Sequence, residues 1–300
     1  MAKLLLEHRA DITVVNADGW KPLNAASNNG HVDVVKTFLE NGADVSVASN
    51  NGWTPLNSAS NNGHVEVVQI LLDNNADIAV AGNNGWTPLN SASDSGHPEV
   101  VGILLQNGAD MTISNVSEWT PLYSASNGGH LEVVKTLLTN GADIAIVNSI
   151  GWMPLYTASS NGHVAVVKVL ENGADVAVVD AHGMSAIFHA AMKGFDSMVK
   201  LLLDKSASKD SFNGPSTTLL NIAAYSWTLP LLRLLLDKFR LDCDVADQQG
   251  RTAAHFAARG GHGDALEYML ELGIDLNAED VKGDGVLHYR MLLAAAHLIR

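Results

Sequence analysis

The sequence predicts an all-α protein, an α-solenoid built from stacked helix pairs with protruding hairpin-like fingers. Tryptophans recur every 33 residues, and a Pro-Leu pair follows each one after a single intervening residue. Gly-His pairs and Ala-Asp pairs keep the same step. The recurring residues are Trp20, Trp53, Trp86, Trp119 and Trp152, with His31, His64, His97, His130 and His163, and with Asp44, Asp77, Asp110 and Asp143. Several markers in one phase indicate a single supersecondary unit repeated along the chain.

The unit from Ser49 to Ala81 shows how each element arises. Thr54-Pro55 is a helix start, because the hydroxyl can cap and proline tolerates the first turn. Asn62-Gly63 ends that helix, and residues 64–72 have the apolar spacing of a second helix. Residues 77–80 run out extended to a turn at 83–85. Two short helices cannot bury their apolar faces alone, so the units must stack.

The motifs Trp53-Thr-Pro-Leu, Gly63-His64-Val-Glu-Val-Val and Ala76-Asp77-Ile resemble the ankyrin repeat, and the resemblance covers essentially the whole chain. The sequence of residues 56–64 is similar to that of the ankyrin tails of large fungal signalling proteins. Where the family pattern has histidine after Thr-Pro-Leu, this chain has asparagine or tyrosine. These residues are Asn24, Asn57, Asn90, Tyr123 and Tyr156, and histidine returns at His255 and His288.

The resemblance implies one ankyrin solenoid over residues 1–300, with boundaries set by the period. We expect a partial repeat at 1–15, repeats at 16–48, 49–81, 82–114, 115–147, 148–179, 180–212, 213–246 and 247–279, and a partial C-terminal cap at 280–300. Residues 3–11 match only a second helix. The chain is therefore expected to be a piece of a longer protein, with a catalytic or signalling domain before it, or to begin with a degenerate cap.

Two departures from the period predict local changes. The 148–179 unit lacks one residue within 167–173, and a deletion inside a helix rotates the remaining turns of that helix by about 100°. We therefore expect a bend or a shortened helix there. Glu118 stands where other fingers have glycine, as at Gly52 and Gly85. Because that position often needs a positive φ, the 115–147 finger is expected to have altered geometry.

Amino-acid composition limits which classes of partner and which cellular compartments are expected. The formal net charge is −14, from 18 basic and 32 acidic residues, so nucleic acid is excluded as a partner and a basic protein surface is favoured. The single cysteine, Cys243, allows no internal disulfide, which indicates the cytosol or the nucleus. No apolar run approaches the ~18 residues of a membrane span.

The sequence predicts no enzyme, no metal and no cofactor. The five Gly-His histidines are equivalent positions roughly 10 Å apart, too far to share a zinc ion, and are expected to bond to nearby backbone. Carboxylates on both sides of Cys243 should raise the pKa of its thiol. The acid pairs Asp242 with Asp244 and Glu279 with Asp280 are interpreted as solvated finger residues.

What the resemblance implies is a binding surface made of the finger tips and the inner face of each first helix. The tryptophan before each Pro-Leu lies at the finger base, where it either contacts a partner or packs on the next finger. Fingertips change from polar residues to Val116 and Ile150, which are unexpected when exposed. Tyr123 and Tyr156 either join this contact centre or take over the buried role of the family histidine. The predicted partner-binding residues are Trp53, Trp86, Val116, Trp119, Tyr123, Ile150, Trp152 and Tyr156.

Elsewhere the inner helix face is expected to be an exposed surface of small and polar residues. This surface either binds an extended peptide or has no partner. Its residues are Ala25, Ser58, Ser91, Ser124 and Thr157, flanked by Asn28, Asn61, Asp94 and Asn127. The leading hypothesis is a non-catalytic protein-interaction scaffold that binds a protein or peptide. A structural spacer or regulatory tail of a larger protein is the alternative, and an enzyme with a cryptic pocket in 213–300 is a remote one.

Overall fold

The computed structural model describes residues 2–205, 218–226 and 229–291. These residues form α-helices and one π-helical turn, and they contain no β-strand; Glu279 and Gly285 form an isolated bridge. The all-α repeat prediction is confirmed. The chain divides into two compact units, residues 1–149 and 150–300, and each is described by itself.

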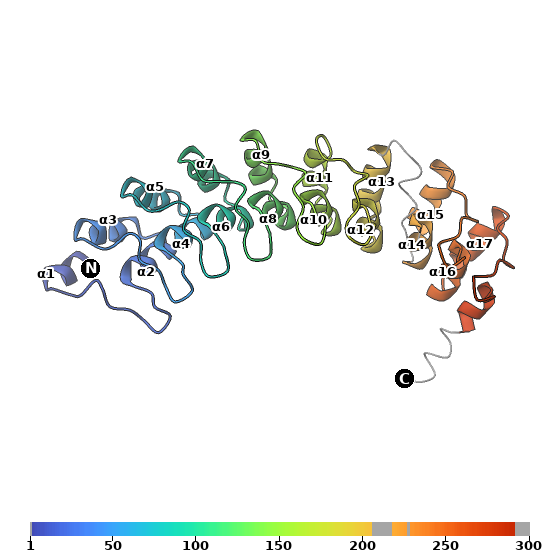
Figure 1. The fold of residues 1–300 in the computed structure, drawn as a ribbon, viewed down its shortest axis with the longest axis horizontal. Helices are drawn as coiled ribbons and strands as arrows, with labels where there is room; N and C mark the ends of the chain where they lie inside the picture. Colours follow the sequence, from blue (N-terminus) through green and yellow to red (C-terminus); the bar gives the residue numbers. More distant parts are fainter. Residues whose placement is uncertain (1, 206–217, 227–228, 292–300) are drawn as a thin grey trace. The chain divides into compact units, whose positions relative to one another are not determined.

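In the first unit, inner and outer helices alternate along the chain (Figure 1). The inner helices stack on one another and are α2 (Pro22–Asn28), α4 (Pro55–Asn61), α6 (Pro88–Asp94) and α8 (Pro121–Gly128). The outer helices form a second row and are α3 (Val32–Glu40), α5 (Val65–Asp73), α7 (Pro98–Gln106) and α9 (Leu131–Thr139). The short α1 (Ala2–Glu7) packs against α3, as an outer helix would.

Local sequence sets the ends of the inner helices. The hydroxyl of Thr54 accepts the N–H of Asn57 at 3.3 Å, and Thr120 accepts that of Tyr123 at 3.3 Å. Proline takes the first helical position, where its missing donor leaves nothing unpaired. Gly63, at φ 72°, turns the chain into the next helix. The core lies between the two rows, where Leu56, Val68 and Leu71 of one repeat are completely buried.

The fingers are tight turns rather than β-hairpins. In one finger Ser49 N–H donates to the carbonyl of Trp53 at 2.9 Å. Neighbouring fingers are joined by single main-chain bonds, such as Asn83 N–H to the Asn51 carbonyl at 2.9 Å. The predicted hairpin-like fingers are therefore present, but neighbouring fingers are held together by main-chain and asparagine side-chain bonds between their tips and not by a ladder.

The second unit repeats the same alternation. Its inner helices are α10 (Pro154–Ser160), α12 (Ala186–Met192), α14 (Leu219–Tyr225) and α16 (Ala253–Gly260). Its outer elements are α11 (Val164–Leu170), α13 (Asp196–Lys205), α15 (Leu229–Arg233) with the π-helical turn η2 (Leu234–Lys238), and α17 (Gly263–Glu271).

Both irregular repeat lengths are absorbed in outer helices. Helix α11 has seven residues where α9 has nine, so the predicted shortening is confirmed. The 213–246 repeat is one residue longer than the period, and η2 takes up the extra residue through a bond from Phe239 N–H to the Leu234 carbonyl at 3.3 Å. Parts of the predicted 180–212 and 213–246 repeats, and of the 280–300 cap, lie outside the described residues.

Candidate functional site

In α2, α4 and α6, the asparagine that replaces the family histidine ties the inner helix to the next finger. The Asn57 amide donates to the carbonyls of Val80 at 3.3 Å and Trp86 at 3.1 Å, and its oxygen accepts the Thr54 N–H at 3.1 Å. Asn24 and Asn90 make equivalent bonds to the carbonyls of Trp53 and Trp119. The tryptophan positions are thus structural through their main chain, whatever their indoles contact.

The Gly-His histidines join successive repeats. His64 Nε2 lies 2.9 Å from the Asn28 carbonyl, His97 Nε2 lies 3.0 Å from that of Asn61, and His130 Nε2 lies 2.7 Å from that of Asp94. These carbonyls end the inner helix of the preceding repeat. The histidines therefore bond to backbone as expected, but the partner is a neighbouring repeat and not a nearby residue in sequence.

The predicted contact residues of the first unit are unequally exposed. Val116 is 73% exposed at its fingertip, whereas the indoles of Trp53, Trp86 and Trp119 are half-buried. Trp53 packs on the next finger so closely that a Cβ on Gly82 would lie 2.6 Å from its Cδ1. Trp119 and Tyr123 have ring centroids 5.2 Å apart, but Tyr123 is only 5% exposed. Of these side chains, Val116 is accessible, Trp119 is accessible in part and Tyr123 is almost entirely covered.

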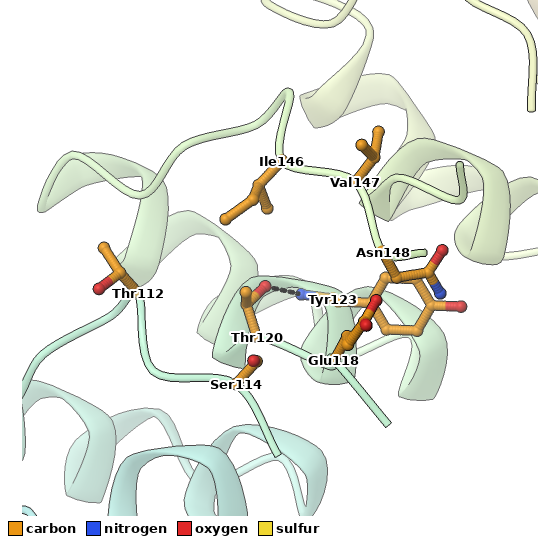
Figure 2. Close-up of a pocket in the computed structure, with 8 residues that line it drawn as sticks. All are labelled: Thr112, Ser114, Glu118, Thr120, Tyr123, Ile146, Val147 and Asn148. Carbon is orange, nitrogen blue, oxygen red and sulfur yellow. Dashed lines mark hydrogen bonds between the residues drawn. The ribbon is translucent and has the colours of Figure 1, made fainter. Parts of the chain in front are cut away.

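A pocket of about 230 Å³ opens beside Tyr123 in the first unit (Figure 2). Two finger segments, 112–120 and 146–148, form its walls. The lining residues are Thr112, Ser114, Glu118, Thr120, Tyr123, Ile146, Val147 and Asn148. The pocket combines hydroxyls, one carboxylate, an aromatic ring and two aliphatic side chains. The repeat pattern did not predict it, because it depends on the spacing of two fingers.

The altered finger geometry predicted at Glu118 is wrong. Glu118 has φ 62°, the same left-handed conformation that Gly52 has at 75° and Gly85 at 78°. The finger keeps its turn, and the glutamate bears a cost of about 1–2 kcal/mol for the clash of its Cβ. What differs is the link to the next finger: Ser149 N–H donates to the Glu118 carboxylate, where other fingers use a main-chain carbonyl.

The second unit holds the other three predicted contact residues. Ile150 is 50% exposed and Trp152 is half-buried, but Tyr156 is completely buried, with its hydroxyl donating to the Val178 carbonyl. His189, which sequence reasoning missed, packs on both aromatic rings, with its ring centroid 4.8 Å from that of Trp152 and 5.7 Å from that of Tyr156. Tyr156 is therefore a buried residue, and its prediction as a partner-contact residue is wrong. The spacing also predicts that the last six of the predicted contact residues converge, namely Val116, Trp119, Tyr123, Ile150, Trp152 and Tyr156. Because these six residues divide between the two units, their convergence stays a prediction.

His189 is held by a finger carboxylate. Its Nε2 lies 2.9 Å from Oδ2 of Asp180, which is buried and also accepts the N–H groups of His182 and Met184. Burial acts to raise the pKa of Asp180, but these donors outweigh it and hold the pKa below its ordinary value. The carboxylate thus holds the imidazole ring that contacts both Trp152 and Tyr156.

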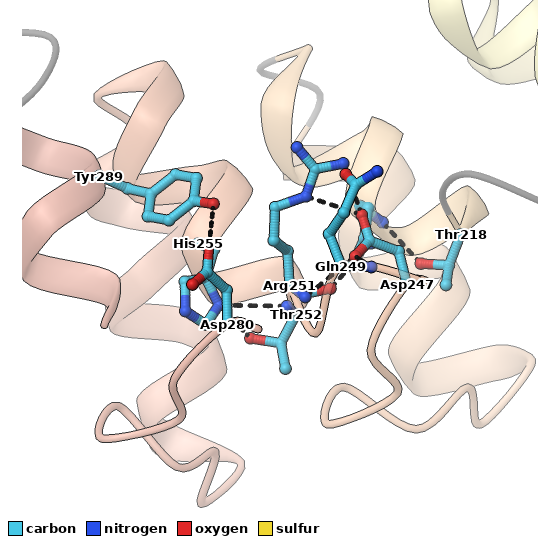
Figure 3. A network of polar contacts seen from close by, with 9 residues as sticks. Thr218, Asp247, Gln249, Arg251, Thr252, His255, Asp280 and Tyr289 are labelled. Atoms are coloured by element: carbon cyan, nitrogen blue, oxygen red, sulfur yellow. Dashed lines mark hydrogen bonds and ion pairs between the residues drawn. The ribbon is translucent and has the colours of Figure 1, made fainter. Parts of the chain in front are cut away.

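Two further finger carboxylates in the second unit, Asp247 and Asp280, also bind neighbouring side chains (Figure 3). Asp247 accepts the N–H groups of Gln249 and Arg251, and Arg251 Nε lies 2.8 Å from its second oxygen. Asp280 accepts the Tyr289 hydroxyl at 2.7 Å, a bond that lowers the pKa of Asp280. Burial and this carboxylate raise the pKa of Tyr289 to about 12. Asp280 is buried, so its interpretation as a solvated finger residue is wrong.

The bare serine surface predicted on the inner helices is also wrong. Ser58, Ser91 and Ser124 are completely buried, and Thr157 is nearly so, because inner helices stack closely enough to cover them. Of the predicted residues on this face, Ala25 is exposed as expected. The accessible polar face consists of the flanking residues at the helix ends. Asn28 and Asn61 accept hydrogen bonds across the repeats, from Asn62 at 3.0 Å and Ser95 at 3.2 Å.

Comparison with known proteins decides the family. A family model described as ankyrin repeats, in blocks of three copies, matches overlapping segments from residue 1 to residue 280. The matched segments are residues 1–82, 46–115, 79–148, 110–180, 155–239 and 187–280.

The chain belongs to the ankyrin-repeat family.

Ankyrin repeats generally mediate protein–protein interaction and are generally non-catalytic. A search of curated proteins gave no match to this chain. Among the described residues, no helix of these ankyrin repeats is both long and apolar enough to cross a membrane.

The remaining reactive side chains sit in ordinary surroundings for an ankyrin protein. Burial, followed by the charges of Asp244 and Asp242, raises the pKa of the Cys243 thiol, as the sequence predicted. Sequence reasoning missed Val281, which stands at the fingertip position of Val116 and is 69% exposed. The sequence signal was its spacing, because Val281 follows Val116 by five periods of 33 residues. The structure confirms the equivalence: the Val281 N–H bonds to the Gln249 carbonyl of the preceding finger, as the Val116 N–H bonds to that of Asn84.

Proposed function

We propose that this chain is a protein-interaction scaffold that binds a protein or peptide on its fingertip surface and performs no chemistry itself. The observation that carries the proposal is the exposure of large aliphatic side chains at fingertips. Val116 is 73% exposed and Ile150 is 50% exposed, and each lies two or three residues before a half-buried tryptophan. Exposed apolar groups beside aromatic rings are typical of contact residues at interfaces.

The proposed contact set is narrower than the pattern predicted. Val116, Trp119, Ile150 and Trp152 offer accessible apolar surface, and Trp53 and Trp86 offer indole edges. Tyr123 and Tyr156 act as supports, because their rings are buried. A rigid support lowers the entropy lost on binding, which is how a preformed surface gains affinity.

The test is partner recovery by the immobilised chain from native lysate. The double variant Trp119→Ala with Ile150→Ala is expected to abolish recovery while the melting profile stays largely intact. Val65→Ala is the matched control, since Val65 is an exposed aliphatic residue on outer helix α5, away from the fingertips. Unchanged recovery by the double variant, measured beside the control, would refute the proposed surface.

A spacer or regulatory tail is the second candidate. It is supported by the near-identity of the 49–81 and 82–114 repeats, whose fingertips are small and polar and whose helices end alike. The absence of any saturable partner in the same recovery experiment would favour it.

A further inference from the structure

The pocket beside Tyr123 contains an acidic group without a counterion. Glu118 occupies a costly left-handed conformation, and one of its carboxylate oxygens, Oε2, accepts the Ser149 N–H. Its other oxygen makes no hydrogen bond to any described residue, and no ion pair within the described chain includes Glu118. A carboxylate in this state can still accept a charged donor.

The surrounding sequence cannot supply that donor. Residues 37–134 contain no lysine and no arginine. The carboxylates in the same stretch are Glu40, Asp44, Glu66, Asp73, Asp77, Asp94, Glu99, Asp110, Glu118 and Glu132. The two lysines that flank the stretch are already paired on outer helices, Lys36 with Glu66 at 3.0 Å and Lys135 with Glu132 at 2.8 Å. The negative electrostatic potential of residues 37–134 therefore attracts a cationic partner.

The pocket's size and lining indicate which cationic group fits. Its volume of about 230 Å³ falls below the roughly 300–1,000 Å³ of small-molecule sites, so it suits one side chain. Thr112, Ser114 and Thr120 contribute hydroxyl acceptors, and Tyr123 contributes an aromatic ring (Figure 2). A guanidinium group matches this lining better than an ammonium, because its planar array of five donors can bond several oxygens and also stack on a ring.

We propose that the Glu118 pocket binds an arginine side chain of the partner, as the polar anchor of the interaction surface proposed above. The exposed Val116 and Val147 lie on the two finger segments that hold the pocket. The matching partner segment therefore carries an aliphatic residue next to its arginine. This inference rests on the proposed function and adds the chemistry that the partner must present.

The test uses the full chain and two capped tripeptides, leucine-arginine-leucine and leucine-citrulline-leucine. Citrulline keeps the shape of arginine without its charge. In NMR titrations the arginine peptide is expected to give saturable shifts at the amides of Glu118, Thr120 and Ser149. The citrulline peptide is expected to bind at least about fivefold more weakly.

Three variants locate the effect. Glu118→Gln is expected to reduce binding of the arginine peptide to the level of the citrulline peptide. Ser114→Lys, which places a cation in the pocket, should block the arginine peptide as well. Glu99→Gln is the matched control, because it removes one exposed carboxylate from outer helix α7 in the same unit and should leave the binding unchanged.

Equal binding of the two peptides, or binding that Glu118→Gln does not weaken, would overturn the arginine anchor. Shifts spread over the acidic outer helices, reduced equally by Glu99→Gln, would mean diffuse attraction and would also overturn it. If the anchor fails while Trp119→Ala with Ile150→Ala still abolishes partner recovery, the scaffold function stands without it. If neither set of variants has an effect, both proposals are wrong.

Discussion

The Asn57 amide donates to the main-chain carbonyl of Trp86 across 3.1 Å, and this partly buried bond joins helix α4 to the base of the following finger. The same side chain serves Val80 and Thr54, so nearly all of its hydrogen-bonding capacity is used. One residue therefore couples the inner helix, its own cap and the next repeat.

Replacing Asn57 tests that coupling. Asn57→Leu removes the side-chain partner of the Thr54 N–H and of the Val80 carbonyl, while the Trp86 carbonyl keeps its bond from the Gly82 N–H. We expect the free energy of unfolding to fall by about 2 kcal/mol. Asn57→His should cost less than about 1 kcal/mol, because His255 in this chain accepts the Thr252 N–H in the equivalent way. Urea denaturation measures both variants. Equal losses for leucine and histidine would show that the hydrogen bonds contribute little.

Glu118→Gly should stabilise the protein by about 1 kcal/mol. Glycine adopts the φ of 62° without strain, and this gain exceeds the loss of an exposed bond to Ser149. The opposite change, Gly85→Ala, should destabilise, since φ is 78° and the new Cβ would lie 2.9 Å from the Val116 nitrogen. Thermal melts of the pair are expected to shift in opposite directions. A lower melting temperature for Glu118→Gly would mean that the carboxylate tie matters more than the backbone.

Ser126→Ala should raise the free energy of unfolding by about 1 kcal/mol. The Ser126 hydroxyl is completely buried on α8 and has no hydrogen-bond partner among the described residues, so removing it relieves an uncompensated desolvation. Ser114→Ala is the control, because Ser114 is exposed and should change stability little. If Ser126→Ala lowered the free energy of unfolding, the Ser126 hydroxyl would have to make a stabilising hydrogen bond, and the prediction would be wrong.

Asp94→Asn should stabilise the protein at neutral pH and not in acid. Burial raises the pKa of Asp94, although the charge of His130 acts against it. The folded state then holds the proton more tightly than the unfolded state does, so stability falls as pH rises through the ordinary carboxyl range. The gain of the variant should be absent near pH 3 and present at pH 7, at the scale of one or two degrees of melting temperature, since Asp94 is partly exposed. Thermal melts of the wild type and Asp94→Asn between pH 3 and pH 7 measure the gain. A gain in melting temperature that did not change with pH would contradict a raised pKa of Asp94 as its cause.

The period predicted most of the fold, because a side chain 33 residues along meets the same neighbours. Trp53 and Trp86 placed the helix starts at Pro55 and Pro88, and the missing residue near Leu170 predicted the short α11. The candidate site was less predictable. Exposure of Val116 followed from its place at a fingertip, but burial of Tyr156 and the position of His189 depend on packing between repeats.

The sequence by itself determined the repeat, its register and the residues that depart from it, since these are properties of spacing along one chain. Only the tertiary structure decided what each departure does. Ser58 is covered because helices stack closely, and Glu118 keeps the glycine conformation because the neighbouring fingers hold the turn. Both outcomes depend on how closely segments about thirty residues apart in sequence approach each other in space. The pattern of residue types along the chain does not give those distances.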